Sequence, residues 1–330
     1  FNHGGTGVLA LSYLNMYGGS DAHYSSDASG GCVRSSGTIY LSGSIVSGCT
    51  AYTYSGAMAK GGGIYAVVSA NVVKSLVTGN TAYNVSNDAR GGGIYVKEGS
   101  VGVNRTTVSS NSAIARGATP GVGGGIFGPD PSISSSTIES NFAGDAGGIY
   151  GGGGSSAHIS NSTVSGNVAS HNGGGIKAYV QFLNIDNSTV AFNTAASFAG
   201  VLGASQLGAF SSIIARNKNT SPGSFADVYL GAAMPTIVGA DNLIVSFNTV
   251  PDAGVITVTA DPQLAPLAFH GGYTRTHALL ATSPALDHGN NDFNLPGDQR
   301  DESRVVNLGA DIGAYERQVN DDELFYNGFD

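Results

Sequence analysis

Lys177, Tyr179 and His171 lie within nine residues of one another and carry side chains that can transfer protons or stabilise negative charge. A β-eliminating polysaccharide lyase needs a base that removes the proton α to a uronate carboxyl, and a cation that stabilises the resulting charge. Lys177 also stands where four earlier repeat units carry an aromatic residue, and Lys97 offers a further cation. We therefore predict Lys177, Tyr179, His171 and Lys97 as candidate catalytic residues. The alternative interpretation is a set of isolated charges on a solvated surface.

Charged residues are sparse in the repeated part of the chain, between residues 61 and 217. A hydrolase would need two carboxylates about 5–10 Å apart, but no two acids recur at matched positions in adjacent units. The candidate charged and histidine residues there are Lys97, Glu98, Arg105, Asp130, Glu139, Asp145, His158, His171, Lys177, Asp186 and Arg216. Their scatter leaves the catalytic hypothesis without a paired motif.

Aromatic residues follow the repeated isoleucine in four units, and they are Tyr65, Tyr95, Phe127 and Tyr150. If the isoleucines point inward, these rings form an external file with one ring on each turn of the chain. Such rings can stack on successive sugars of an extended polysaccharide. The alternative is an aromatic ladder that stabilises the sheet through cross-strand pairs. The sequence leaves both interpretations open.

An acidic stretch from Asp287 to Asp301 contains the oxygen ligands that calcium prefers. Asp287, Asp292 and Asp298 are the candidate ligands, although their spacing matches no known calcium loop. The alternative is an ionic network that holds an irregular segment together. In that network Arg300 would pair with Asp287, Asp298, Asp311 or Glu316.

A repeated motif must position the candidate residues between positions 61 and 217. Gly-Gly-Gly-Ile-aromatic is followed after about seventeen residues by Ser-Thr-Val-Ser-x-Asn, and the pair then recurs. The asparagines are Asn80, Asn111, Asn141, Asn167, Asn193 and Asn217, which are 31, 30, 26, 26 and 24 residues apart. Units of this length cannot bury an apolar face alone and must stack on their neighbours.

Within each unit the apolar residues alternate, which is the periodicity of strands. Two or three short strands per unit make one coil of a parallel β-helix, in which like residues form columns about 4.8 Å apart. We predict an inward column of Ile64, Ile94, Ile126, Ile149 and Ile176, and a second of Val77, Val108, Ile138, Val164 and Val190. The asparagines form a third column in a turn, and the glycines make sharp corners.

Composition and charge narrow the function classes. Only 11% of the 330 residues are charged and 51 are glycine, which argues against long amphipathic helices. The net charge of −9 and the lack of a basic patch argue against nucleic acid as a partner. No stretch approaches the ~18 apolar residues that span a membrane. The chain starts in mid-pattern without a signal peptide, so we expect a trimmed product of something longer.

Cys32 and Cys49 are 17 residues apart and fall within one turn of the repeat. A disulfide in an exported protein is one interpretation, and a redox or metal pair is the other. The metal hypothesis would need more ligands than the surrounding sequence offers.

The alternation of Gly-Gly-x-Ile with Asn resembles the right-handed parallel β-helix repeats of polymorphic outer-membrane proteins. Residues 261–317 resemble the ending of bacterial choice-of-anchor Q domain proteins. The motifs that carry this second resemblance are Asp261-Pro262-Gln263-Leu264, Gly271-Gly272-Tyr273-Thr274-Arg275, Ser283-Pro284-Ala285-Leu286-Asp287, Asp298-Gln299-Arg300 and Asp311-Ile312-Gly313-Ala314-Tyr315-Glu316. The resemblance implies export and display at the bacterial cell surface or release. It implies no single activity, since pectate-lyase-like folds include lyases, hydrolases, epimerases, adhesins and scaffolds.

The fold prediction is an all-β, single-stranded right-handed parallel β-helix of about eight or nine coils over residues 1–260. An irregular C-terminal cap over 261–317 and an acidic-aromatic tail over 318–330 follow. We expect a secreted or cell-surface monomer with a structural or adhesin-like role that binds a polysaccharide or cell-envelope glycan, with calcium as the only candidate cofactor. The alternative is a polysaccharide lyase acting on an extended acidic glycan. Ice binding by Thr107, Thr137, Thr163 and Thr189 ranks third, because that file is one column wide.

Overall fold

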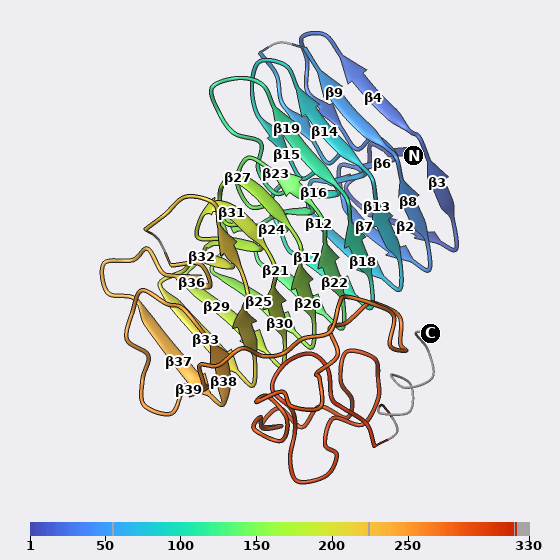
Figure 1. The fold of residues 1–330 in the computed structure, drawn as a ribbon. Coiled ribbons are helices and arrows are strands. Elements are labelled where there is room, and N and C mark those ends of the chain that lie inside the picture. Colours follow the sequence, from blue (N-terminus) through green and yellow to red (C-terminus); the bar gives the residue numbers. More distant parts are fainter. Residues whose placement is uncertain (55, 224, 320, 322–330) are drawn as a thin grey trace, which may run out of the picture.

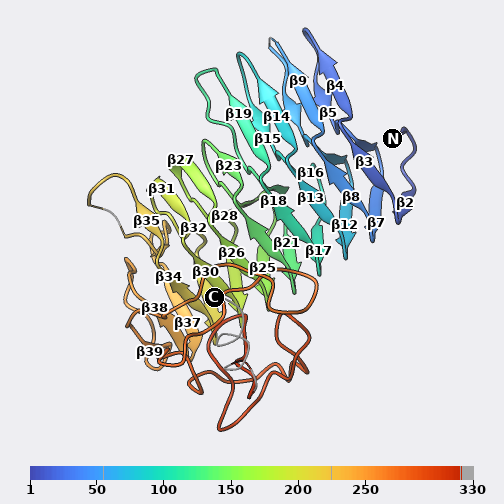
Figure 2. The same cartoon turned by 45° about the vertical axis from the view of Figure 1, so that its right-hand side comes forward.

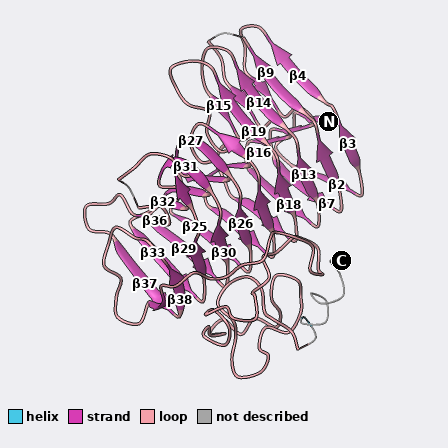
Figure 3. Cartoon of the chain, in the orientation of Figure 1, coloured by secondary structure: helices cyan, strands magenta, loops and turns pink. Residues whose placement is uncertain are grey.

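The computed structural model describes residues 1–54, 56–223, 225–319 and 321. Most of the predicted acidic-aromatic tail, from residue 322 onward, therefore lies outside the described residues. All 39 named elements are β-strands, and Figure 3 shows them as stacked arrows beside a loop-rich C-terminal segment. Every pairing between named strands is parallel, and the chain winds through about eight turns of a β-helix (Figure 1). The predicted all-β parallel helix is confirmed.

Five sheets run the length of the helix or part of it. Sheet A contains β1 (Asn2–His3), β6 (Val33–Ser35), β11 (Ile64–Ala66), β16 (Ile94–Val96), β20 (Ile126–Gly128), β24 (Ile149–Gly152), β28 (Ile176–Tyr179), β32 (Val201–Gly203) and β36 (Val228–Tyr229). Sheet B contains β2 (Val8–Ser12), β7 (Thr38–Ser42), β12 (Ser69–Val73), β17 (Val101–Asn104), β21 (Pro131–Ser134), β25 (Ser156–Ser160), β29 (Phe182–Asp186), β33 (Gln206–Phe210) and β37 (Thr236–Ala240).

The remaining sheets complete each coil. Sheet C contains β3 (Asn15–Tyr17), β8 (Ile45–Ser47), β13 (Leu76–Thr78), β18 (Thr107–Ser109), β22 (Thr137–Glu139), β26 (Thr163–Ser165), β30 (Thr189–Ala191), β34 (Ile213–Ala215), β38 (Asn242–Ile244) and β39 (Ile256–Val258). Sheet D contains β4 (Ser20–His23), β9 (Thr50–Thr53), β14 (Thr81–Asn84), β19 (Ser112–Ala115), β23 (Phe142–Ala143), β27 (Val168–Asn172), β31 (Thr194–Ser197) and β35 (Lys218–Asn219). The short sheet E contains β5 (Ala28–Ser29), β10 (Ala59–Lys60) and β15 (Ala89–Arg90).

The core is made of columns of like residues, as predicted. In sheet A, Ile64 pairs with Ile94 and Ile94 with Ile126, and the column continues through Ile149 to Ile176. These side chains are at most 1% exposed. The second predicted column runs in register through sheet C from Val77 to Val190. Because parallel strands in register place identical side chains over one another, one apolar position per unit is enough to build a continuous core.

The predicted asparagine column forms a hydrogen-bonded ladder. The Nδ2 of Asn80 donates to the Oδ1 of Asn111 at 2.9 Å, and the same bond recurs at 2.9 Å from Asn111 to Asn141 and at each later step up to Asn217. The ladder ends on the carboxylate of Asp227. Each Oδ1 also accepts the backbone N–H of the asparagine one coil away, for example that of Asn111 from Asn80. The ladder therefore satisfies buried backbone groups that would otherwise lack partners.

The residue before each ladder asparagine, and not the asparagine, takes the left-handed conformation. Gly79 has a φ of 65° and Ser110 a φ of 55°. The first glycine of a triplet also has positive φ, as at Gly61 (62°). The second glycine is required for a different reason, because a Cβ atom at Gly62 would lie 2.4 Å from the carbonyl oxygen of Gly92. The glycine corner thus combines a left-handed turn with a close approach of two coils.

A second ladder, which the repeat did not predict and which we call the serine ladder, holds the turn between sheets B and C. The backbone N–H of Ser44 donates to the Oγ of Ser75 at 3.1 Å, and that of Ser75 donates to the Oγ1 of Thr106 at 3.1 Å. The pattern continues through Ser136 to Ser162. This turn is therefore fixed in every coil that carries the hydroxyl.

Cys32 and Cys49 form a disulfide with a Cα–Cα distance of 5.6 Å, so the predicted pairing is confirmed. Both residues belong to the main hydrophobic core. The bond therefore ties one side of a coil to another from the inside.

The C-terminal segment, residues 261–319 and 321, contains no named strand and lies along the flank of the helix. Figures 1 and 2 show it in orange and red beside β22, β26 and β30. Its apolar residues Ala278, Leu279, Ile312 and Tyr315 form a small second core with residues of sheet C. The sequence predicts a C-terminal cap over residues 261–317, and the structure shows this part of the chain in contact with sheet C. The lateral position arises because the outer face of sheet C offers small hydroxyl and apolar side chains onto which a loop-rich segment can pack.

Candidate functional site

The aromatic file stacks on itself. The rings of Tyr65 and Tyr95 lie 5.5 Å apart, those of Tyr95 and Phe127 5.0 Å, and those of Phe127 and Tyr150 4.6 Å, with interplanar angles of 8° or less. Tyr65 and Tyr95 are only 9% and 6% exposed. The ring faces are therefore occupied by neighbouring rings, as in the stabilising ladder that was the alternative interpretation. Ring edges and hydroxyl groups are the parts that a ligand could reach.

Lys177 extends this file as a buried cation. Its Nζ lies 2.9 Å from the Oδ2 of Asp145, and both side chains are mostly buried. The ammonium also lies 5.3 Å from the ring centroid of Tyr179, whose side chain is exposed. The structure therefore brings Lys177 and Tyr179 together, and it adds Asp145 as the charge partner of the lysine.

The other two predicted catalytic residues have different neighbours. His171 is exposed on β27, where its Nδ1 lies 3.4 Å from the Oγ of Ser170. Lys97 pairs with Glu98 at 2.7 Å, and both side chains are more than half exposed. No hydrogen bond or ion pair among the described residues joins either of them to Lys177. The four predicted residues do not form one cluster.

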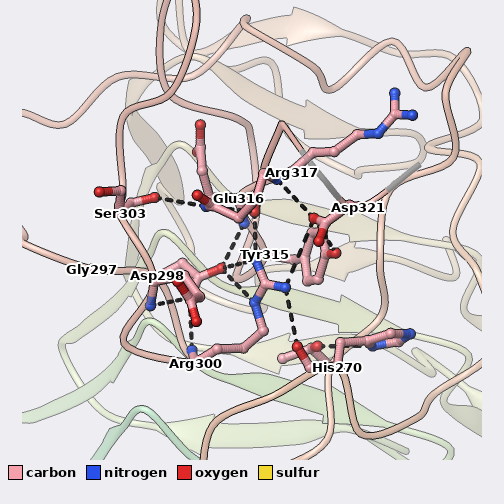
Figure 4. Close-up of polar contacts among 12 residues, drawn as sticks. His270, Gly297, Asp298, Arg300, Ser303, Tyr315, Glu316, Arg317 and Asp321 are labelled. Carbon is pink, nitrogen blue, oxygen red and sulfur yellow. Dashed lines mark hydrogen bonds and ion pairs between the residues drawn. The ribbon is translucent and has the colours of Figure 1, made fainter. Parts of the chain in front are cut away.

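The acidic stretch forms an ionic network in place of a cluster of calcium ligands. The Oδ2 of Asp298 accepts from the Nε of Arg300 at 2.9 Å, and both side chains are at most 2% exposed (Figure 4). Arg300 also donates to the backbone oxygen of Glu316. Asp287 and Asp292 are exposed, and the described residues contain no group of three or more His, Cys, Asp or Glu side chains able to hold a metal. The pairing of Arg300 with Asp298, which was the alternative to calcium, is confirmed.

The threonine file of sheet C is the seam to which the C-terminal segment is attached. The Oγ1 of Thr137 donates to the backbone oxygen of Arg275 at 2.6 Å, and that of Thr163 donates to Gln299 at 2.6 Å. The Oγ1 of Thr189 accepts the backbone N–H of Ala314 at 3.1 Å. These three threonines are at most 2% exposed. The open threonine array that ice binding would require is therefore covered.

Beyond the end of this seam, sheet C is open and hollowed. Two adjoining depressions share Leu76, Thr107 and Phe269, and together they form one groove over β13 and β18. We call this the seam groove. Its lining is Gly43, Ser44, Ile45, Lys74, Ser75, Leu76, Thr78, Arg105, Thr107, Ser109, Ser110, Glu139, Ser140, Phe269, Tyr273 and Arg275. Strands of the helix provide the floor with its hydroxyl groups, and the C-terminal segment provides one wall.

Two aromatic residues of that wall are exposed, Phe269 at 65% and Tyr273 at 52%. Each ring has a cation nearby. The guanidinium of Arg275 lies 5.3 Å from the centroid of Phe269, and the ammonium of Lys74 lies 4.9 Å from that of Tyr273. Arg105 approaches Tyr273 at 6.0 Å. Exposed aromatic faces beside cations and hydroxyl groups form a surface on which sugars and charged groups can bind.

A buried carboxylate completes the seam groove. Glu139 lies on β22 and is 6% exposed, and its Oε2 lies 3.5 Å from the Nη1 of Arg275. Burial raises the pKa of Glu139, and the nearby Arg275 charge offsets part of this rise. A carboxyl group with a raised pKa at the side of an open groove can exchange a proton with a bound molecule.

The sequence did not single out the seam groove. In the sequence Arg105 and Glu139 stand only among scattered charges, and no motif marks Lys74. Phe269 and Tyr273 lie about 165 to 200 residues from the helix residues that they face. One signal was present, because Tyr273 and Arg275 belong to the Gly-Gly-Tyr-Thr-Arg motif of the C-terminal resemblance.

Comparisons of the sequence and fold with protein-family models, curated proteins and solved structures find no match. Among the described residues, no helix is long and apolar enough to cross a membrane.

Proposed function

We propose that this protein is a secreted or cell-surface β-helix protein that binds an extended polysaccharide in the seam groove. The observation that carries the proposal is the pair of exposed rings, Phe269 and Tyr273, beside three cations above a floor of hydroxyl groups. Proteins bind sugars through aromatic faces combined with hydrogen-bonding groups, because a sugar ring has both apolar and hydroxyl surfaces. Because the groove crosses adjacent coils, its elongated shape fits an extended polysaccharide better than a compact ligand.

Two observations support the proposed location. The disulfide between Cys32 and Cys49 is typical of oxidising compartments outside the cytosol. The resemblance of the repeats to polymorphic outer-membrane proteins, and of residues 261–317 to choice-of-anchor Q endings, implies export and surface display. Binding to a polysaccharide or cell-envelope glycan would give such a protein an adhesin-like role.

The test is affinity for a panel of soluble polysaccharides and oligosaccharides, both acidic and neutral, measured by calorimetry. We expect a Phe269→Ala, Tyr273→Ala double variant to weaken binding by at least about tenfold, because both stacking surfaces are removed. Phe142→Ala, which removes an exposed ring from sheet D, is the matched control and should bind normally.

A Tyr95→Ala, Tyr150→Ala variant tests the aromatic file in the same assay. Loss of affinity in that variant alone would move the binding site from the seam groove to sheet A. Failure of the wild-type protein to bind any member of the panel would reject the proposal.

A second candidate function is a polysaccharide lyase, and the raised pKa of Glu139 beside Arg275 favours it. Incubation with uronic-acid polymers, followed at the absorbance of the unsaturated product, would reveal this activity. Glu139→Gln should then abolish it. Activity that persists in Lys177→Ala and Lys97→Ala would exclude those two lysines as the groups responsible.

A further inference from the structure

The turn between sheets B and C places one residue per coil in the left-handed conformation. These residues stack into what we call the turn column, with φ between 45° and 57°. Its members are Tyr13, Gly43, Lys74, Arg105, Ser135, Asn161, Asn187, Ser211 and Asp241. The serine ladder fixes the backbone beside the column, for example through the bond from the N–H of Ser75 to Thr106 at 3.1 Å. The conformation is therefore imposed on whichever residue occupies the column.

Lys74 and Arg105 are energetically unfavourable residues for the turn column. Left-handed backbone favours glycine and asparagine, which the chain uses at Gly43, Asn161 and Asn187. Residues Val73 and Asn104 pair in register, so Lys74 and Arg105 occupy adjacent levels about 4.8 Å apart along the helix axis. Two like charges on neighbouring strands repel each other. A placement that is unfavourable for both backbone and charge is the kind expected at a functional site.

Only one of the two cations has a carboxylate partner. Arg105 forms a bidentate ion pair with Asp301 of the C-terminal segment, with Nε to Oδ2 at 3.0 Å and Nη2 to Oδ1 at 2.6 Å. Lys74 forms no ion pair with a carboxylate among the residues that the structure describes, and its ammonium lies 4.9 Å from the centroid of the Tyr273 ring. An uncompensated positive charge therefore lines the seam groove of a protein whose net charge is −9.

An exposed ring extends the groove surface along the column. Tyr13 is 85% exposed, and its ring lies against Gly43, where a Cβ atom would come within 2.8 Å of the ring carbons. Tyr13, Gly43 and Lys74 follow one another at successive levels of the column. A chain lying along the column would therefore meet a ring, a small residue and a cation in that order.

We infer that the seam groove selects an anionic polysaccharide, and that Lys74 is the residue that determines this specificity. The inference rests on the proposed function and deepens it. A carboxylate or sulfate group of one sugar pairs with the Lys74 ammonium, while sugar rings lie against Tyr273 on one side and Tyr13 on the other. The bound anion also reduces the repulsion between Lys74 and Arg105, so the ligand supplies the charge that the column lacks.

The test compares ligands that differ only in charge. Polygalacturonate and its fully methyl-esterified form share one backbone, and dextran sulfate and dextran separate sulfate from carboxylate recognition. Affinities are measured by calorimetry at low and high salt. The main variant is Lys74→Asn, which removes the charge and supplies a residue better suited to left-handed backbone. Lys218→Asn removes an exposed lysine from sheet D and is the matched control.

We expect Lys74→Asn to weaken binding of the preferred acidic polymer by about tenfold and to reduce its salt dependence, while the neutral form binds as before. The midpoint of thermal unfolding should stay the same or rise in Lys74→Asn, because the strained and repelled lysine is gone. A merely structural lysine would give the opposite result, a lower midpoint with unchanged affinity.

Two outcomes separate failure of this inference from failure of the proposed function. Equal binding of acidic and neutral forms, with Lys74→Asn unchanged, would overturn the specificity and leave glycan binding intact. Absence of binding to all four polymers and to the wider panel would reject both. Preference for dextran sulfate over polygalacturonate would support the inference and assign sulfate as the recognised group.

Discussion

The β-helix and the C-terminal segment are stabilised in different ways. In the helix, the same interaction recurs in successive coils. Asn111 donates a side-chain hydrogen bond to Asn141, and Asn141 donates the same bond to Asn167. In the segment, each interaction occurs once, as in the buried pair of Arg300 with Asp298 (Figure 4). Repetition spreads the stabilisation along the helix, whereas the segment depends on a few charged groups that must all be present. The seam groove forms where the two meet, and its cations are Lys74 and Arg105 from the helix and Arg275 from the segment.

The largest expected effect concerns the charge network of the segment. Replacing Arg300 by Leu would leave the Asp298 carboxylate buried without its partner, which should cost about 3–5 kcal/mol in the free energy of unfolding. The loss should be confined to the segment. Hydrogen exchange would then show residues 261–319 opening while the amides of sheets A and B keep their protection. If sheets A and B lost protection equally, the two regions would form one cooperative unit.

A substitution in the asparagine ladder tests how the β-helix is stabilised. Asn141→Ala would leave the backbone N–H and the side-chain amide of Asn111 without their acceptor. We expect a loss of about 2–4 kcal/mol, because both donors are buried. Chemical denaturation measures this loss, and Asn71→Ala, a half-buried residue of sheet B outside the ladder, is the control. Equal effects of the two substitutions would mean that the ladder bonds add little to stability.

The smallest expected effect is a dependence on pH that originates at the seam. His277 is 4% exposed, its Nδ1–H donates to the backbone oxygen of Ala265, and its Nε2 accepts from Ser165. Burial lowers the pKa of His277 to about 4. As the pH falls below about 6.5, the unfolded state binds a proton at His277 more readily than the folded state does, so the free energy of unfolding decreases. The decrease due to this residue reaches about 2 kcal/mol at pH 5 and continues toward pH 4.

Unfolding free energies measured between pH 7 and 4.5 would test this dependence. In a His277→Gln variant the acid-induced loss should become shallower, since the residue no longer titrates. An identical pH profile for the variant and the wild-type protein would place the acid sensitivity elsewhere.

The sequence predicted the ladders because each one repeats a residue type at a fixed position. The isoleucine and asparagine columns are visible at intervals of 23 to 32 residues, and both are confirmed. The serine ladder was missed, since serine is common in this chain and stands in turns for many reasons. The disulfide was one of two interpretations, because spacing alone does not give the distance between two cysteines.

Much less of the candidate site than of the fold could be predicted from the sequence. The aromatic file was located correctly, but its ring faces contact one another, which depends on side-chain orientation and not on spacing. The predicted catalytic residues divide into Lys177 with Tyr179 on one hand, and separate His171 and Lys97 on the other. Lys74 and Tyr273 are 199 positions apart, and no repeat connects them.

The sequence by itself determined that this chain stacks into a parallel β-helix. Its apolar and amide side chains recur with one period, and stacking coils of that length buries the apolar columns and pairs the amides in the turns. The tertiary structure alone decided where the irregular segment lies, which charges remain without partners, and where a groove opens. The physical reason is the range of the interactions. Stacking between coils is set by residues one unit apart, whereas the seam joins groups more than a hundred residues apart that carry no shared pattern.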